Sequence, residues 1–72
     1  MTDRDEYITS LGLAFGIEIL GRLPAEDRTS TDDLDSEDMK HLLARLVPSE
    51  RSRLGLRNIV RLKLSSLDAD EA

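Results

Sequence analysis

The chain has 72 residues, of which 39% are hydrophobic and 35% are charged, and its formal net charge is −5 at pH 7. This length allows a single small domain over residues 1–72, which buries only about 60% of the surface that its unfolded chain exposes. The absence of cysteine excludes a disulfide framework and a thiolate metal site. With Tyr7 and Phe15 as its only aromatic residues, the chain is also poorly equipped to stack nucleic-acid bases.

The hydrophobic residues predict an all-α fold. Leucine occurs 13 times, whereas isoleucine and valine together occur six times, and a composition rich in leucine and poor in β-branched residues favours helices. We expect a small bundle of three helices, with at most one additional short helical turn. Because a core of this size is marginally stable alone, we expect a second copy or another partner to complete it.

The first helix is predicted over residues 3–23, with acidic residues in its first turn where the helix dipole favours them. Hydrophobic residues lie on two opposite faces of this helix. One face carries Ile8, Leu11, Phe15 and Ile19. A helix with two apolar faces is usually central in a core or shared between subunits, so we expect a homodimer. The residues expected at that interface are Gly12, Leu13, Gly16, Ile17 and Leu20.

Pro24 is expected to end the first helix and to open a polar connection over residues 24–35, with a helical turn at 24–27. The second helix is predicted over residues 35–47. Asp35 is its expected N-cap, and Leu34 and Met39 stand where a hydrophobic staple would place them. Its apolar stripe has clear helical spacing.

The third helix is predicted over residues 49–67, directly after Pro48. Within it, residues 60–64 alternate strictly between apolar and basic side chains, as a half-buried strand would. We favour a helix, because the rest of the chain offers no partner strand. Residues 68–72 form an acidic tail that we expect to be frayed.

Charge is distributed unevenly along the chain. Residues 1–38 carry three basic and eleven acidic side chains, whereas residues 39–72 carry seven basic and four acidic ones. The acidic residues cluster at Asp32, Asp33, Asp35, Glu37 and Asp38. The spacing of this cluster does not fit a calcium loop, because Asp38 and Ala44 stand where glycine and a bidentate glutamate are required. We interpret it as a helix-capping surface that can also contact a partner.

Arg53, Arg57 and Arg61 are spaced four residues apart and form one line on the third helix, which we call the arginine ridge. The ridge follows a helix–proline–helix junction, so the chain resembles a helix-turn-helix DNA-binding layout, and a dimeric DNA-binding regulator is the alternative function. The net charge of −5 opposes binding to phosphates. We interpret the ridge first as a surface that pairs with the acidic half of the chain or with a partner.

The sequence contains no glycine-rich phosphate loop, metal-ligand spacing or nucleophile motif, and its only histidine, His41, has no expected catalytic partner. We therefore expect no catalytic activity, cofactor or small-molecule substrate. The longest apolar stretch, residues 11–17, is much shorter than the roughly 20 residues that span a membrane. We expect a cytoplasmic protein with no membrane association.

Together these observations predict a small non-catalytic protein–protein interaction module that regulates, links or inhibits a larger complex. An inhibitor encoded by a phage or another mobile element belongs to this class. We expect the acidic cluster and the arginine ridge to be the surfaces that bind the partner.

Overall fold

The computed structural model describes residues 3–70, with side chains placed for residues 3–68, and these residues are entirely free of strands. They form three α-helices, α1 (Asp3–Gly21), α2 (Ser30–Leu46) and α3 (Glu50–Asp70), and a short 3-10 helix, η1 (Ala25–Asp27). The predicted all-α, three-helix class with one extra short turn is confirmed. The strand alternative for residues 60–64 is wrong, because these residues lie inside α3.

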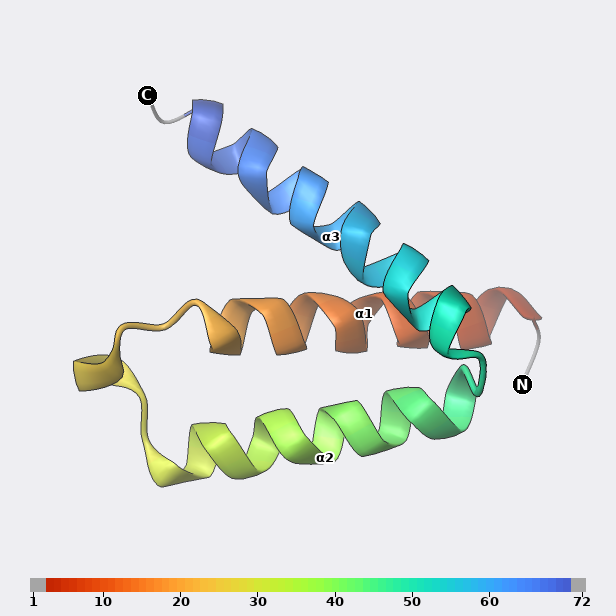
Figure 1. Ribbon diagram of the computed structural model, residues 1–72, viewed down its shortest axis with the longest axis horizontal. Coiled ribbons are helices and arrows are strands. Elements are labelled where there is room, and N and C mark those ends of the chain that lie inside the picture. Colours follow the sequence, from red (N-terminus) through yellow and green to blue (C-terminus); the bar gives the residue numbers. More distant parts are fainter. Residues whose placement is uncertain (1–2, 71–72) are drawn as a thin grey trace.

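The helices are arranged around α1 (Figure 1). Helices α1 and α2 run side by side in opposite directions, and α3 crosses α1 obliquely so that its C-terminal half extends away from α2. Helices α2 and α3 have little contact with each other. The radius of gyration is 13.1 Å, which exceeds the roughly 11 Å expected for a compact domain of this length. The three helices therefore form an open arrangement in which α1 supplies most of the packing.

The core lies where α1 meets the other two helices. Its buried side chains are Ala14 and Ile17 of α1, Leu43 of α2, and Leu56 and Val60 of α3. Ser10 is also buried, and its hydroxyl donates a hydrogen bond to the carbonyl of Glu6 at 2.7 Å. This bond within α1 satisfies the hydroxyl without a partner from another helix.

A small residue lets α2 lie close to α1. A Cβ atom placed on Gly16 would lie 2.9 Å from the Sδ atom of Met39, so the Met39 side chain occupies the space that glycine leaves open. Gly16 was expected at a dimer interface. In the structure it belongs to the contact between α1 and α2.

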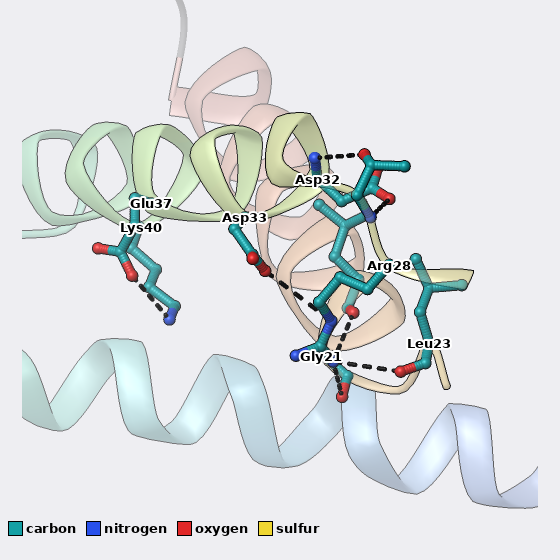
Figure 2. Close-up of polar contacts among 9 residues, drawn as sticks. Gly21, Leu23, Arg28, Asp32, Asp33, Glu37 and Lys40 are labelled. Carbon is teal, nitrogen blue, oxygen red and sulfur yellow. Dashed lines mark hydrogen bonds and ion pairs between the residues drawn. The ribbon is translucent and has the colours of Figure 1, made fainter. Parts of the chain in front are cut away.

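Helix α1 ends two residues earlier than predicted. The amides of Arg22 and Leu23 bond to carbonyls three residues back, which tightens the last turn before Pro24. The Arg28 guanidinium then donates to the carbonyls of Leu20, Gly21 and Leu23 at 3.0–3.2 Å (Figure 2). These bonds supply acceptors at the end of α1 with a donor from outside the helix, in addition to the Leu23 amide that already bonds to the Leu20 carbonyl.

Helix α2 begins at Ser30, five residues before the predicted start, and the expected N-cap at Asp35 is wrong. The N-cap is Thr29, which forms a capping box with Asp32. Leu34 therefore lies inside the helix with an exposed side chain and cannot act as a staple residue. Carboxylates in the first turns offset the poor helix propensity of these polar residues, because they interact favourably with the helix dipole.

Helix α3 begins at Glu50, after a turn in which the Ser49 hydroxyl accepts a hydrogen bond from the amide of Ser52 at 3.2 Å. It continues to Asp70, three residues beyond the predicted end, so the first part of the expected acidic tail is helical. The last two tail residues, 71 and 72, lie outside the described residues. Within the described range, no helix combines the length and apolar character needed to cross a membrane.

Candidate protein-interaction surface

The arginine ridge of α3 lies against other parts of the same chain. The Nε atoms of Arg57 and Arg61 each donate a hydrogen bond of 3.2 Å to the same carboxylate oxygen of Glu18. The Nη2 atom of Arg57 also lies 3.2 Å from this oxygen. Glu18 projects from α1, and its side chain is only 11% exposed. The pairing between a basic helix and the acidic half of the chain is thus intramolecular. It places one carboxylate between two guanidinium groups and holds α3 in register on α1.

Arg53, the first residue of the ridge, fixes the junction between α2 and α3. Its Nη1 atom donates to the carbonyls of Val47 at 2.7 Å and Pro48 at 2.9 Å. These carbonyls follow the C-terminus of α2, where the helix dipole favours a cation. The ridge is therefore a set of structural contacts as well as a charged surface.

An open groove lies between α2 and α3, above α1. Its volume is about 350 Å³. The apolar part of its lining comes from Ile17, Leu43, Ala44 and Leu54. The Leu54 side chain is 55% exposed to solvent. The groove exists because α2 and α3 both pack on α1 and hardly touch each other.

Charged side chains surround the apolar part of this α2–α3 groove. Lys40 of α2 and Arg53 and Arg57 of α3 supply three cations, and Glu50 supplies one carboxylate. Lys40 is exposed and lies 3.5 Å from Glu37 on the same helix. An exposed pair at this distance contributes little to stability, so Lys40 can exchange it for another acidic group. The groove thus combines an apolar surface with a net positive rim.

The acidic cluster occupies the first half of α2, and its members have different roles. Asp32 belongs to the capping box, and Asp33 lies 3.9 Å from the Arg28 guanidinium (Figure 2). Asp35 and Asp38 are exposed on the helix surface. No group of three potential ligands suited to a metal ion occurs among the described residues. The cluster contributes to helix capping and leaves an acidic surface beside the end of α1.

The five residues expected at a dimer interface lie in different environments in the structure. Ile17 is 4% exposed and lies in the core of the monomer, and Gly16 contacts α2. Leu13 and Leu20 are half-buried, and only Gly12 is exposed with open space around it. The exposed apolar face of α1 is instead the one that carries Ile8 and Ile19.

The sequence did not predict the contact made by Glu18 or the groove lining contributed by Lys40 and Leu54. Glu18 offered one usable signal, since it is the single charged residue between Tyr7 and Gly21 in an otherwise apolar helix. A lone carboxylate in such a helix needs a cation nearby. Lys40 and Leu54 offered no comparable signal, because their common location depends on how α2 and α3 pack on α1.

Comparison of the chain with protein-family models, with curated protein sequences and with solved structures found no match.

Proposed function

We propose that this protein is a non-catalytic protein–protein interaction module whose α2–α3 groove binds an acidic, apolar segment of a partner protein. The observation that carries the proposal is the composition of the groove: an apolar lining between two helices, with Lys40, Arg53 and Arg57 at its edge. Amphipathic helices commonly bind such grooves through apolar anchors spaced three or four residues apart.

The size and openness of the groove favour a protein segment as its occupant. A volume of about 350 Å³ is at the lower limit of ordinary ligand pockets, and the exposed Leu54 side chain leaves the groove open to solvent. A partner helix can insert two or three side chains here while its backbone remains above the groove. Aspartate or glutamate residues beside these anchors would pair with Lys40 and the accessible edges of Arg53 and Arg57.

Binding of this kind suits a regulator, adaptor or inhibitor that acts by occupying a surface of a larger complex. The alternative function, a helix-turn-helix DNA-binding regulator, relies on the arginine ridge. No observation favours this alternative, because the guanidinium groups of Arg57 and Arg61 contact Glu18 and that of Arg53 contacts backbone carbonyls. The net charge of −5 also weakens attraction to phosphates.

The proposal is tested by affinity capture from cell extract followed by mass spectrometry, using the wild-type chain and three variants in parallel. Leu54→Glu introduces a carboxylate into the groove, and Lys40→Glu reverses a charge at its edge. Leu34→Glu is the matched control, because Leu34 is an exposed leucine that does not line the groove. Circular dichroism establishes that each variant keeps its helical content.

We expect a protein captured by the wild-type chain to be lost at least about tenfold with Leu54→Glu and Lys40→Glu, which corresponds to about 1.4 kcal/mol. The Leu34→Glu control should retain it. Equal capture by all four chains, or loss only with Leu34→Glu, would rule out the groove as the binding surface.

A further inference from the structure

The α2–α3 groove continues along α2 into a second, more acidic hollow. This hollow has a volume of about 230 Å³ and shares Lys40 with the groove, so the two form one trough along the side of α2. Figure 2 shows Asp33, Glu37 and Lys40 in a row on this side of the helix. The rim of the second hollow carries the carboxylates of Asp32, Asp33 and Glu37 together with Arg28 and Lys40. The trough is therefore basic at one end and acidic at the other.

The charges of α2 are divided in the same way. Its five acidic residues, the acidic cluster, all lie between Ser30 and Asp38, whereas Lys40 and Arg45 in its second half are its only basic residues. A second α2 that runs antiparallel to the first places its acidic half at the basic end of the trough and its basic half at the acidic end. Electrostatic complementarity of this kind selects the partner and the orientation of an interface.

Leu34 gives the acidic half of α2 an apolar anchor. Its side chain is 65% exposed and lies outside both hollows. Glu37 and Asp38 follow it by three and four residues, so they are its neighbours on the helix surface. An exposed leucine beside carboxylates fits the α2–α3 groove, because the groove offers Ala44 and Leu54 surrounded by cations. The chain thus carries both the groove and a segment that is complementary to it.

The first turn of α1 is the competing acidic segment of this chain. It carries three carboxylates close to Tyr7 and Ile8, which are about half exposed. Arg4 lies in the same turn, 5.9 Å from the centre of the Tyr7 ring, and brings a positive charge to the apolar part of this segment. Such a charge opposes entry into a groove with a net positive rim. The acidic half of α2 contains no basic residue and has a more exposed apolar side chain, so it is the better occupant.

We propose that the occupant of the α2–α3 groove is a second copy of this chain, with the two α2 helices antiparallel across a twofold axis near the middle of α2. Leu34 of each copy contacts Ala44 and Leu54 of the other. Glu37 of each copy pairs with Lys40 of the other, which replaces the exposed pair within one helix. Each copy both offers a groove and fills one, so the dimer is closed. The inference rests on the proposed function, because it names the partner that binds the same groove.

Analytical ultracentrifugation tests the dimer. At about 0.5 mM, where a dimer with a micromolar dissociation constant is almost fully formed, we expect the wild-type chain to sediment as a dimer and to form no larger species. Leu34→Lys should raise the dissociation constant at least about tenfold, because it brings an ammonium group to a basic groove. Leu54→Glu should do the same, because it brings a carboxylate to the acidic half of α2. Leu62→Lys and Leu62→Glu are the matched controls, since Leu62 is an exposed leucine that lines neither hollow, and both should leave the dimer intact.

Mixing the two variants separates an interface effect from a folding effect. In an equimolar mixture of Leu34→Lys and Leu54→Glu, a mixed dimer has one unchanged leucine contact and one contact in which the new lysine faces the new glutamate. This dimer should therefore be at least about tenfold tighter than the dimer that either variant forms with itself. A variant that fails to fold cannot be rescued in this way, and circular dichroism checks that each variant keeps its helical content.

A monomeric wild-type chain, oligomers that grow beyond two copies, or a mixture of the two variants that stays monomeric would overturn the inference. The proposed function is decided separately, by capture of a foreign protein from extract. A monomeric chain whose capture is lost with Leu54→Glu and Lys40→Glu would keep the groove as a binding surface and exclude a second copy as its occupant. If the second copy is the occupant, Leu34→Lys should capture at least as much foreign protein as wild type, because its groove is no longer filled. A dimer that Leu54→Glu leaves unchanged, together with equal capture by all chains, would remove both proposals.

Discussion

The two faces of α1 are similar in composition but differ completely in their surroundings. Ile17 and Ile19 are identical residues two positions apart, yet Ile17 is in the core and Ile19 is about half exposed. Two steps along an α-helix turn the side chain through about 200°, so the two residues point to nearly opposite sides. Burial in this protein is therefore decided by which side of α1 the neighbouring helices reach, and hydrophobicity alone does not decide it.

Replacement of each isoleucine by alanine gives the largest expected contrast. Ile17→Ala removes packing inside the core and should lower the free energy of unfolding by about 2–4 kcal/mol. Ile19→Ala removes a side chain that is already about half exposed, and should cost no more than about 1 kcal/mol in dilute solution. Urea denaturation at low protein concentration measures both values. Equal losses for the two variants would mean that the inner and outer faces of α1 are not distinguished in solution.

Glu18 marks the border between the two faces, and its removal is the next largest effect. Glu18→Ala leaves Arg57 and Arg61 without their shared acceptor and should lower the free energy of unfolding by about 1–2 kcal/mol. Because both arginines are partly exposed, salt should weaken the contact, and the difference from wild type should shrink as ionic strength rises. Glu26→Ala, at an exposed glutamate of η1, is the control and should change stability by less than about 0.5 kcal/mol.

Arg28 stabilises the end of α1 where both faces terminate. Arg28→Lys keeps the positive charge but loses the planar group that reaches three carbonyls. We expect a loss of about 1 kcal/mol and faster amide exchange in the last turn of α1, measured by hydrogen–deuterium exchange. A uniform change in exchange over all three helices would contradict a local capping role for Arg28.

Gly12 and Gly16, two of the three glycines of α1, give the smallest contrast. Gly12→Ala should raise the stability of the dilute monomer by about 0.5–1 kcal/mol, because the added methyl group meets no neighbour. Gly16→Ala should bring a smaller gain, because its methyl group would require the end of the Met39 side chain to move. Thermal unfolding of both variants in dilute solution measures the difference. A larger gain at Gly16 than at Gly12 would indicate that α2 lies farther from α1 than in the structure.

Most of the secondary structure follows from local sequence. Pro24 and Pro48 separate three segments with helical apolar spacing, and these segments correspond to α1, α2 and α3. The predicted start of α2 is wrong by five residues, because the polar residues after Thr29 have low helix propensity and resemble a connection. Thr29 and Asp32 nevertheless have the spacing of a capping box, so this start could have been identified from sequence.

Less of the candidate site was predictable. The charge difference between the two halves indicated that basic and acidic segments attract each other, and the contact of Glu18 with Arg57 and Arg61 is one instance of this. The α2–α3 groove could not be predicted, because Lys40 and Leu54 are far apart in sequence and meet only through the way their helices pack on α1.

The sequence by itself determined the helical class, the number of helices and the apolar faces of each helix, because these depend on interactions between residues a few positions apart. It also showed that α1 has two apolar faces. Only the tertiary structure decided which face is inside. Small residues at Ala14 and Gly16 let the other helices approach one side, and Glu18 binds two arginines of α3 at its edge. These contacts join distant parts of the chain, and they leave the Ile8 and Ile19 side chains of α1 about half exposed.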